Sequence, residues 1–365
     1  MRVCAAGLRG IPEIMGGIEA HCEQLYTELS NEVEDIVILA RSPYVKKPFK
    51  FKKNVSVIPV FTIRNKILET FLHTLICIFY ARLIIKPDVL HIHGIGPALF
   101  TPFAKLLGLK VLVTHHGADY NRKKWNWFAK RTLLLGEYLA IRYADVIIVV
   151  GATLTDELKP QYPYQAHKIK FIPNGCPLLF LDCDIGNISI PSDINVETGK
   201  YILFVGRLVQ EKGVHDLINA FSIAALDDIK LLIVGGTDFD DRYSKELLNL
   251  ATETIIFAGT RSGKDLLAIY RSAKLFVLPS YHEGLPIVAL EALSLSVPLL
   301  LSNISPHLDI DLHPDNYFEI GNICELVKGL KSPVPATIDK NLIERKYNWS
   351  NIARNTTFLL EKCNE

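Results

Sequence analysis

Residues 274–295 read KLFVLPSYHEGLPIVALEALSL, and this stretch predicts a strand, a short loop and a helix, in that order. The apolar run Leu275–Leu278 has the composition of a strand that is buried on both faces. Pro279 ends the strand, and Pro286 stands where the first residue of a helix reaching Leu295 is expected. Such a helix N-terminus carries unpaired backbone N–H groups and a partial positive charge, so we expect it to hold a phosphate.

Two carboxylates flank this predicted phosphate site. Glu283 lies in the loop before the helix, and Glu291 lies within the helix. A carboxylate can accept two hydrogen bonds from a vicinal diol, such as the hydroxyls of a ribose or a hexose. A phosphate site with two diol-binding carboxylates predicts that a nucleotide sugar binds here. The alternative is an ordinary buried helix preceded by a solvated Glu283.

The string HEGLP at 282–286, followed by Glu291, resembles the Glu-x7-Glu signature of retaining glycosyltransferases of family four, also called glycosyltransferase group 1. This resemblance implies the GT-B fold, an α/β architecture in which two Rossmann-like doubly wound parallel-sheet domains face each other. It also implies that Glu283 contacts the sugar ring, that Glu291 holds the ribose, and that Gly284 and Leu285 belong to the donor-binding residues.

A hydrophobic content of 49% indicates a folded chain. A chain of 365 residues is too long to fold around one small core, so we expect two or three domains. The seven cysteines are scattered and form no CxxC pair, so we expect the reduced thiols of an intracellular protein. The stretch Val3–Leu8 is too short for a secretory signal and suits a first strand. Thr70–Ala81 has 12 uncharged residues, fewer than the roughly 20 that span a bilayer, so we expect a core helix there.

Charge divides unevenly along the chain. Residues 1–181 hold 23 Lys and Arg against 14 Asp and Glu, a net of +9, whereas residues 182–365 hold 17 against 25, a net of −8. Two basic clusters in the first half contain aromatic residues, a combination typical of surfaces that contact anionic lipids. No nucleic-acid recognition module accompanies them. The clusters are a predicted loop at 46–53 (KKPFKFKK) and residues 122–131 (RKKWNWFAKR). The alternative for each is a solvated face.

Short apolar runs alternate with helical stretches along the whole chain, which predicts doubly wound parallel sheets. We expect an acceptor-side domain at 1–180, a linker at 181–197 and a nucleotide-sugar-binding domain at 198–348. The resemblance implies that a C-terminal helix, here Trp349–Leu360 with Ser350 as N-cap, crosses back onto the first domain. Expected strands are Arg2–Leu8, Asp35–Arg41, Val55–Phe61, Asp88–His93, Lys110–Thr114, Asp145–Val150, Lys168–Pro173, Tyr201–Gly206, Lys230–Gly235, Ile255–Ala258, Leu275–Leu278, Leu299–Ser302 and Tyr317–Ile320.

The loop after the first expected strand reads GLRGIPEIMGGIE at 7–19, and it lacks the GxGxxG dinucleotide fingerprint. It does place Gly16 and Gly17 directly before an amphipathic helix, where glycines let the backbone approach an anion closely. The alternative is a plain loop. The string is similar to a rhamnosyltransferase-like branch of the family, which implies donor-phosphate or acceptor contacts for the two glycines.

Histidines gather at the ends of two expected strands, in LHIHG at 90–94 and THHGAD at 114–119. Ligands of open α/β sheets bind at such strand ends. We expect His91 and His93 to point to opposite faces of their strand, which argues against a metal site. The family resemblance implies a donor- or acceptor-contacting role for His116 and a turn lining the site at Asn174. Asp119 and Arg122 are the expected acceptor contacts.

In the second half, FVGRL at 204–208 is followed by EKG at 211–213, so two cations follow a strand that ends at Gly206. Arg207 can grip a phosphate through two hydrogen bonds, and Lys212 can act as a point charge. The alternative is a surface Arg/Lys pair. The string resembles the diphosphate-binding motif of the family. We expect no metal and no cofactor, because these cations can neutralise the leaving diphosphate; the Asp-x-Asp tripeptides at 182–184 and 309–311 follow no clear strand.

The residues described above, together with the family resemblance, predict a metal-independent glycosyltransferase of the hexosyltransferase type, and the resemblance implies that it is retaining. Its partners would be a nucleotide-diphosphate sugar, a lipid-linked or polysaccharide acceptor and an anionic membrane surface, with no nucleic acid. The expected setting is cell-surface polysaccharide biosynthesis (O-antigen, lipopolysaccharide or capsule type), in the cytoplasm and peripheral to the inner face of the plasma membrane. Predicted catalytic residues are Glu283, His116, Arg207 and Lys212. The alternatives are a nucleotide-sugar epimerase of the same fold and a non-catalytic carbohydrate- or membrane-binding protein.

Overall fold

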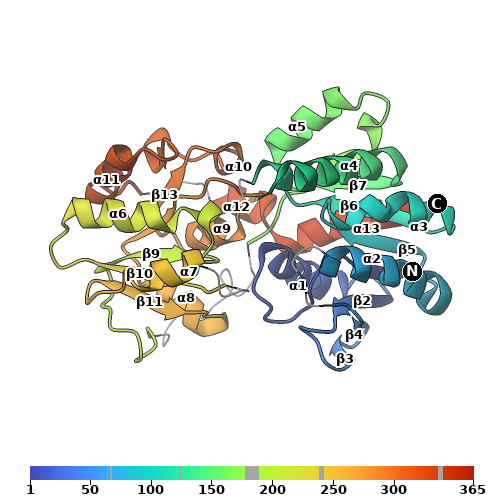
Figure 1. Cartoon of the computed structure of the whole chain (residues 1–365), viewed down its shortest axis with the longest axis horizontal. Coiled ribbons are helices and arrows are strands. Elements are labelled where there is room, and N and C mark those ends of the chain that lie inside the picture. Colours follow the sequence, from blue (N-terminus) through green and yellow to red (C-terminus); the bar gives the residue numbers. More distant parts are fainter. Residues whose placement is uncertain (64, 66–67, 123–124, 177–188, 238–241, 336–339) are drawn as a thin grey trace. The chain divides into compact units, whose positions relative to one another are not determined.

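The computed structural model of the chain (Figure 1) describes all residues except 64, 66–67, 123–124, 177–188, 238–241 and 336–339. It divides into two compact units. Unit 1 consists of Met1–Gly175 together with Trp349–Glu365, and unit 2 consists of Cys176–Asn348. Residues 181–188 of the stretch expected as a linker, 181–197, lie outside the described residues, and so does the tripeptide at 182–184.

Unit 1 is built on an eight-stranded sheet in the order β3-β4-β2-β1-β5-β6-β7-β8, parallel except for the β3–β4 pair. The strands at its centre are apolar runs buried on both faces, as parallel strands covered by helices must be. Their bounds are β1 Arg2–Ala6, β2 Asp35–Arg41, β3 Phe49–Lys52, β4 Val55–Val60, β5 Val89–His93, β6 Lys110–His115, β7 Val146–Val149 and β8 Ile169–Phe171.

Unit 2 is built on a six-stranded parallel sheet in the order β11-β10-β9-β12-β13-β14. Each sheet is doubly wound, because the chain builds outward from one strand and then returns to pair on that strand's other side. The reversal falls between β1 and β5 in unit 1 and between β9 and β12 in unit 2. The bounds are β9 Tyr201–Val205, β10 Lys230–Val234, β11 Ile255–Gly259, β12 Leu275–Leu278, β13 Leu299–Ser302 and β14 Tyr317–Phe318.

Helices fill the connections between strands, and the last helix, α13, packs beside α1 in unit 1 (Figure 1). Unit 1 contains α1 Gly17–Leu29, α2 Leu68–Tyr80, the π-helix η1 Ala81–Ile85, α3 Thr101–Leu106, the 3₁₀ turn η3 Asp119–Asn121, α4 Trp127–Tyr143, α5 Ala152–Gln161 and α13 Trp349–Asn364. Unit 2 contains α6 Val214–Ala224, α7 Arg242–Leu248, α8 Gly263–Arg271, α9 Ile287–Ser294, α10 Ser305–Leu308, α11 Ile323–Lys331 and α12 Lys340–Lys346.

Three local predictions are wrong. The predicted basic loop at 46–53 contains the edge strand β3, which pairs antiparallel with β4. Ser350 lies inside α13 and is not its N-cap: its hydroxyl donates to Glu28 Oε2 of α1 at 2.7 Å. Pro286 is the N-cap of α9 and has extended backbone, so the helix begins one residue later than predicted.

The apolar segment expected as a core helix at 70–81 is longer than predicted, because α2 and η1 run on through the charged Arg82. Within the described residues, the span Leu68–Ile85 is long and apolar enough to cross a membrane by length and composition alone, with 18 residues and a mean hydropathy of 1.6. Only 39% of it is buried. One side packs on the core through Cys77, Ile78 and Ala81, and the other side is exposed.

Candidate functional site

Two loops of unit 2, the one after β9 and the one after β12, are tied together at the point where the strand order reverses. The backbone N–H of Tyr281 donates to the carbonyl oxygen of Glu211 at 2.8 Å. Gly213 has φ 66°, and a Cβ there would collide with the carbonyl oxygen of Pro279. Only glycine therefore permits this close approach of the two loops. Ligands of doubly wound sheets bind at such a reversal.

Lys212 and Glu283, both predicted site residues, form a buried ion pair across these loops. Only 14% of the Lys212 side chain and 10% of the Glu283 side chain are exposed. The Ser280 hydroxyl donates to the same oxygen, Glu283 Oε1, at 2.7 Å. Burial is the largest influence on the pKa of Glu283 and would raise it, but Lys212, His307 and the serine together lower it below its ordinary value. Glu283 is therefore an anion held beside a cation.

His307 and Ser302 support this pair and were missed by the sequence analysis. The Ser302 hydroxyl donates to the carbonyl oxygen of Ser280 at 2.6 Å, and His307 Nδ1 lies 2.8 Å from the carbonyl oxygen of Ser302. Burial lowers the pKa of His307 to about 4. Ser302 is the last residue of β13, a strand expected from sequence, and His307 follows five residues later, so their position at the end of this strand was the available signal.

Arg207 follows Gly206 at the end of β9 and is half-buried, with Nη2 3.8 Å from Glu211 Oε1. This carboxylate stands on the loop that also carries Lys212. The predicted diphosphate-binding residues Gly206, Arg207 and Lys212 therefore belong to one loop, and Glu283, Gly284 and Leu285 belong to the loop joined to it.

Glu291, on the buried face of α9, is a carboxylate strongly perturbed by burial. Its Oε2 atom has no hydrogen-bond partner among the described residues. Burial raises its pKa to about 7, and a hydrogen bond with Tyr270 offsets only part of this effect. A buried carboxylate with an unsatisfied oxygen is costly for folding, and such groups are enriched at functional sites.

We expect Glu291→Gln to stabilise unit 2 at pH 8. A raised carboxyl pKa favours folding fully below the ordinary pKa of 4.5, and this contribution is lost as the pH rises through about 7. The difference between these pKa values corresponds to roughly 3 kcal/mol, and we expect a net gain of about 1–3 kcal/mol because the amide also needs partners. Thermal melts should show the two proteins diverging between pH 4.5 and 7. Equal melting temperatures at pH 8 would show that burying the ionised Glu291 carboxylate does not destabilise the protein.

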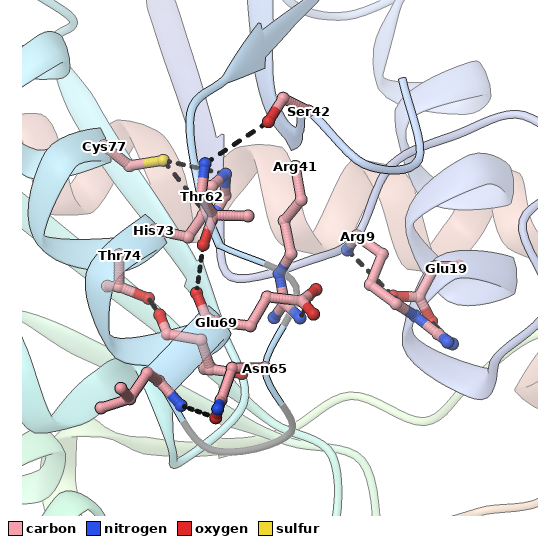
Figure 2. Close-up of polar contacts among 12 residues, drawn as sticks. Arg9, Glu19, Arg41, Ser42, Thr62, Asn65, Glu69, His73, Thr74 and Cys77 are labelled. Carbon is pink, nitrogen blue, oxygen red and sulfur yellow. Dashed lines mark hydrogen bonds and ion pairs between the residues drawn. The ribbon is translucent and has the colours of Figure 1, made fainter. Parts of the chain in front are cut away.

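In unit 1, a buried ion pair holds the glycine loop that precedes α1 (Figure 2). Arg9 Nη2 lies 3.1 Å from Glu19 Oε2, and the Arg9 backbone N–H donates to Glu19 Oε1 at 3.0 Å. Gly16 has φ 153°, and a Cβ there would collide with both charged groups. Gly16 is the N-cap of α1, and Gly17 is its first residue. The Arg9–Glu19 ion pair therefore fixes the loop that carries the predicted donor-binding glycines.

The histidines at the ends of β5 and β6 form a connected network, and the prediction that His91 and His93 point to opposite faces is wrong. The Tyr26 hydroxyl lies 2.9 Å from His91 Nδ1 and 2.7 Å from His93 Nε2, so both rings lie on one side. Side chains two positions apart in a strand share a face. His93 Nδ1 in turn lies 3.1 Å from His116 Nε2. His115 points away from this network and pairs with Glu137 at 2.8 Å.

His21 of α1 joins this group and was also missed by the sequence analysis. Its ring lies edge-on to that of His116, with centroids 4.7 Å apart, and its Nδ1 lies 2.9 Å from Asn174 Oδ1. Burial lowers the pKa of His21 to about 4 and holds that of His116 well below its ordinary value. The network thus brings two predicted site residues, His116 and Asn174, together around His21.

The remaining predicted acceptor residues lie just beyond β6. Asp119 begins the η3 turn, and its Oδ1 pairs with Arg122 Nη2 at 2.6 Å. Both side chains are about a quarter exposed, so they remain accessible to a ligand. The described structure places His116, Asn174, Asp119, Arg122, Gly16 and Gly17 in unit 1, and Gly206, Arg207, Lys212, Glu283, Gly284, Leu285 and Glu291 in unit 2.

Family comparison assigns each half of the chain. Residues 15–178 match the model of Glycosyltransferase Family 4, and residues 189–332 match the model of Glycosyl transferases group 1.

Curated relatives with similar sequences agree with this family assignment. The chain is 30% identical over 237 residues to an uncharacterized glycosyltransferase of Methanocaldococcus jannaschii, covering 60% of each protein. It is 28% identical to glycogen synthase of Mycobacterium tuberculosis, covering 83% of this chain and 78% of that one. It is 27% identical to the capsular polysaccharide biosynthesis glycosyltransferase CapM of Staphylococcus aureus, covering 51% of this chain and 50% of that one. The alignments thus span between half and about three quarters of these relatives.

Solved structures share the fold over the whole length. Sucrose-phosphate synthase of Thermosynechococcus elongatus has a TM-score of 0.77 at 20% identity and covers 99% of this chain and 98% of that one. HepE of Anabaena, solved in complex with UDP-glucose, has a TM-score of 0.76 at 15% identity, and the alignment covers 99% of this chain and 100% of that one. The expected fold of two Rossmann-like units is confirmed. The chain belongs to the group 1 (family 4) glycosyltransferases of GT-B fold.

Proposed function

We propose that this protein transfers a sugar, with retention of anomeric configuration and without a metal at the diphosphate, from a nucleotide-diphosphate sugar to a hydroxyl of a lipid-linked or polysaccharide acceptor. The proposed setting is the assembly of a cell-surface polysaccharide of the O-antigen or capsule type. The names of two relatives, glycogen synthase and CapM, favour polysaccharide synthesis over small-molecule acceptors. The string at 7–19 favours the rhamnosyltransferase-like branch, without identifying the sugar.

The observation that carries this proposal is the Lys212–Glu283 pair beside Arg207 at the strand reversal of unit 2. An ammonium group has three donors, so Lys212 can keep its bond to Glu283 and also donate to a phosphate oxygen. The Arg207 guanidinium can donate two further bonds. Fixed cations in a water-poor site stabilise the charge that develops on a departing diphosphate. Glu283 can then accept from the sugar hydroxyls, and Glu291 from the ribose hydroxyls.

Acceptor binding is assigned to unit 1, through His116, Asp119, Arg122 and the Gly16–Gly17 loop. The neutral imidazole of His116 can accept a hydrogen bond from a hydroxyl. Retention rests on the family resemblance, which implies that the donor diphosphate itself accepts the proton of the attacking hydroxyl.

The function is tested by incubating the protein with a panel of nucleotide sugars and lipid-linked acceptors in the presence of a chelator, and by assigning the anomeric proton of the product by NMR. Transfer with the donor's anomeric configuration is expected. Inversion at the anomeric carbon would contradict the proposed mechanism. Sugar C2 inversion with donor alone would instead reveal an epimerase.

A lipid-linked acceptor requires access to a membrane, and unit 1 has a surface suited to it. We define the apolar surface as the exposed side chains of η1, α3 and α4: Leu83, Ile84, Leu106, Trp127 and Phe128, which are between 61% and 82% exposed. Phe79 of α2 contacts Phe103 of α3 with ring centroids 5.1 Å apart, and α3 packs on α4, so these helices are neighbours. Arg131 lies over the Trp127 ring at 5.5 Å, and Arg82 of η1 and Lys86 directly after it are exposed.

We expect the double variant Leu83→Glu/Ile84→Glu to bind vesicles of anionic phospholipid at least about tenfold more weakly than the wild type, because burying one large apolar side chain contributes about 1.5–3 kcal/mol. Sedimentation with vesicles measures this partition. Ile223→Glu, at a 57% exposed residue of unit 2, is the control and should bind like the wild type. Unchanged binding of the double variant would remove the apolar surface from the proposal, and peripheral membrane location with it.

A further inference from the structure

Three histidines from three separate elements of unit 1 converge on one point. His21 stands on α1, His93 ends β5, and His116 follows β6. In the described part of the chain, one ring nitrogen of each can be chosen so that all three atoms lie within 4.8 Å of one another. His21 and His93 are 3% and 0% exposed, so the cluster lies in the protein interior and not among surface side chains.

Hydrogen bonds hold two of these rings through one nitrogen and leave the other nitrogen of each ring able to bind a ligand. Asn174 Oδ1 can only accept, so His21 Nδ1 carries the proton of their 2.9 Å bond and Nε2 keeps its lone pair. This Nε2 atom is buried and has no hydrogen-bond partner among the described residues. The Tyr26 hydroxyl lies 2.7 Å from His93 Nε2, and it can accept a hydrogen bond from this nitrogen while it donates to His91 Nδ1. In this arrangement His93 Nδ1, which faces His116 Nε2, keeps its lone pair. Partners of this kind fix the imidazole ligands of metal sites.

The spacing of His93 and His116 suits a cation as it stands, whereas the third ring, within 4.8 Å, would have to move inward when an ion binds. His93 Nδ1 and His116 Nε2 are 3.1 Å apart. Two nitrogens bound to one tetrahedral zinc ion, each at 2.0–2.1 Å, are about 3.3 Å apart. Three imidazole nitrogens suit Zn²⁺ and the neighbouring ions Co²⁺, Ni²⁺ and Cu²⁺, whereas Mg²⁺ and Ca²⁺ prefer oxygen ligands.

We propose that His21, His93 and His116 bind one divalent transition-metal cation of the zinc type, with Asn174 and Tyr26 orienting two of the ligands. Three protein ligands leave a fourth position for water or a hydroxyl group. The site belongs to unit 1 and is separate from the diphosphate chemistry assigned to Arg207 and Lys212 of unit 2. It shares His116 with the proposed acceptor site, but metal binding can be measured without any transfer reaction.

The test is a titration of tag-free, chelator-treated full-length protein with ZnCl₂ by calorimetry and with CoCl₂ by visible absorption. We expect one equivalent of Zn²⁺ per chain and a tetrahedral Co²⁺ spectrum without an intense thiolate charge-transfer band. His21→Asn, His93→Asn and His116→Asn should each weaken binding more than 100-fold, since even loss of a supporting residue costs about 10–100-fold. Asn174→Ala, which keeps all three imidazoles, should fall within that smaller range.

His167→Asn replaces an exposed histidine of unit 1 and should bind like the wild type. Stoichiometric binding that survives all three ligand substitutions, a Co²⁺ spectrum with thiolate bands, or no stoichiometric binding by the wild type would each overturn the proposal. Where a ligand variant fails to fold, as judged by circular dichroism, Asn174→Ala and the wild-type Co²⁺ spectrum decide the question.

Discussion

Replacing Lys212 with methionine should lower the rate of sugar transfer by about 10²–10³-fold, the usual cost of removing one donor that stabilises developing negative charge. Lys212 is the buried cation paired with Glu283 at the proposed diphosphate site. Methionine keeps most of the volume of the side chain and removes its charged donor group. Single-turnover rates with saturating donor measure the chemical step. Lys264→Met, at an exposed lysine of α8, is the matched control and should retain wild-type rates.

Folding must be separated from chemistry in this experiment. Lys212→Met leaves Glu283 buried without its cation, which should destabilise the protein by about 3–5 kcal/mol. The double variant Lys212→Met/Glu283→Leu removes both charges and should recover much of that loss in thermal melts. It should still be inactive. A double variant that recovers activity along with stability would show that the pair is structural and that the catalytic assignment is wrong.

Breaking the Arg9–Glu19 pair should have the second largest effect, a loss of about 3–5 kcal/mol from the stability of unit 1 in Arg9→Ala or Glu19→Ala. The Arg9 and Glu19 side chains are only 12% and 7% exposed, so either partner left alone would be a buried charge (Figure 2). Denaturant unfolding followed by circular dichroism measures the loss. Arg242→Ala breaks an ion pair that is exposed on both sides, and it should leave the unfolding curve unchanged.

The pH dependence of this effect has a definite sign. Burial alone would raise the pKa of Glu19, but the charge of Arg9 and its hydrogen bonds lower it below the ordinary value of 4.5. Its contribution to stability is therefore present above pH 4.5 and is lost as the pH falls through the lowered pKa. The difference between wild type and Glu19→Gln should shrink in acid. A difference that grows as the pH falls would contradict the assigned role.

Sequence patterns predicted the strands best where both faces are buried. The expected bounds of Asp35–Arg41, Leu275–Leu278 and Leu299–Ser302 are those observed, because parallel strands under helices read as unbroken apolar runs. The edge strand Phe49–Lys52 was missed because its lysines alternate with phenylalanines, and this pattern was interpreted as a basic loop that contacts anionic lipids. The extent of the apolar helix was underestimated at Arg82, whose charge faces solvent and does not interrupt the helix.

Contacts between residues far apart in the sequence could not be predicted from the sequence. Glu283 and Lys212 each stand in a recognisable motif, but their direct pairing depends on the packing of two loops that are 71 residues apart. His21 stands in no motif, and its partner Asn174 is 153 residues away, so only the folded sheet brings them together. The placement of His91 and His93 was open to prediction, because the period of two in a strand places them on one face.

The central claim is that Arg207 and Lys212 of unit 2 bind the diphosphate of the donor. Its most direct test is a calorimetric titration of the full-length protein with nucleoside diphosphates in the presence of a chelator. We predict saturable binding of at least one such nucleotide by the wild type and by Lys264→Met, and at least about tenfold weaker binding by Arg207→Ala/Lys212→Met. Equal affinity in the wild type and in the variant that lacks both cations, or no binding of any nucleoside diphosphate, would contradict the claim.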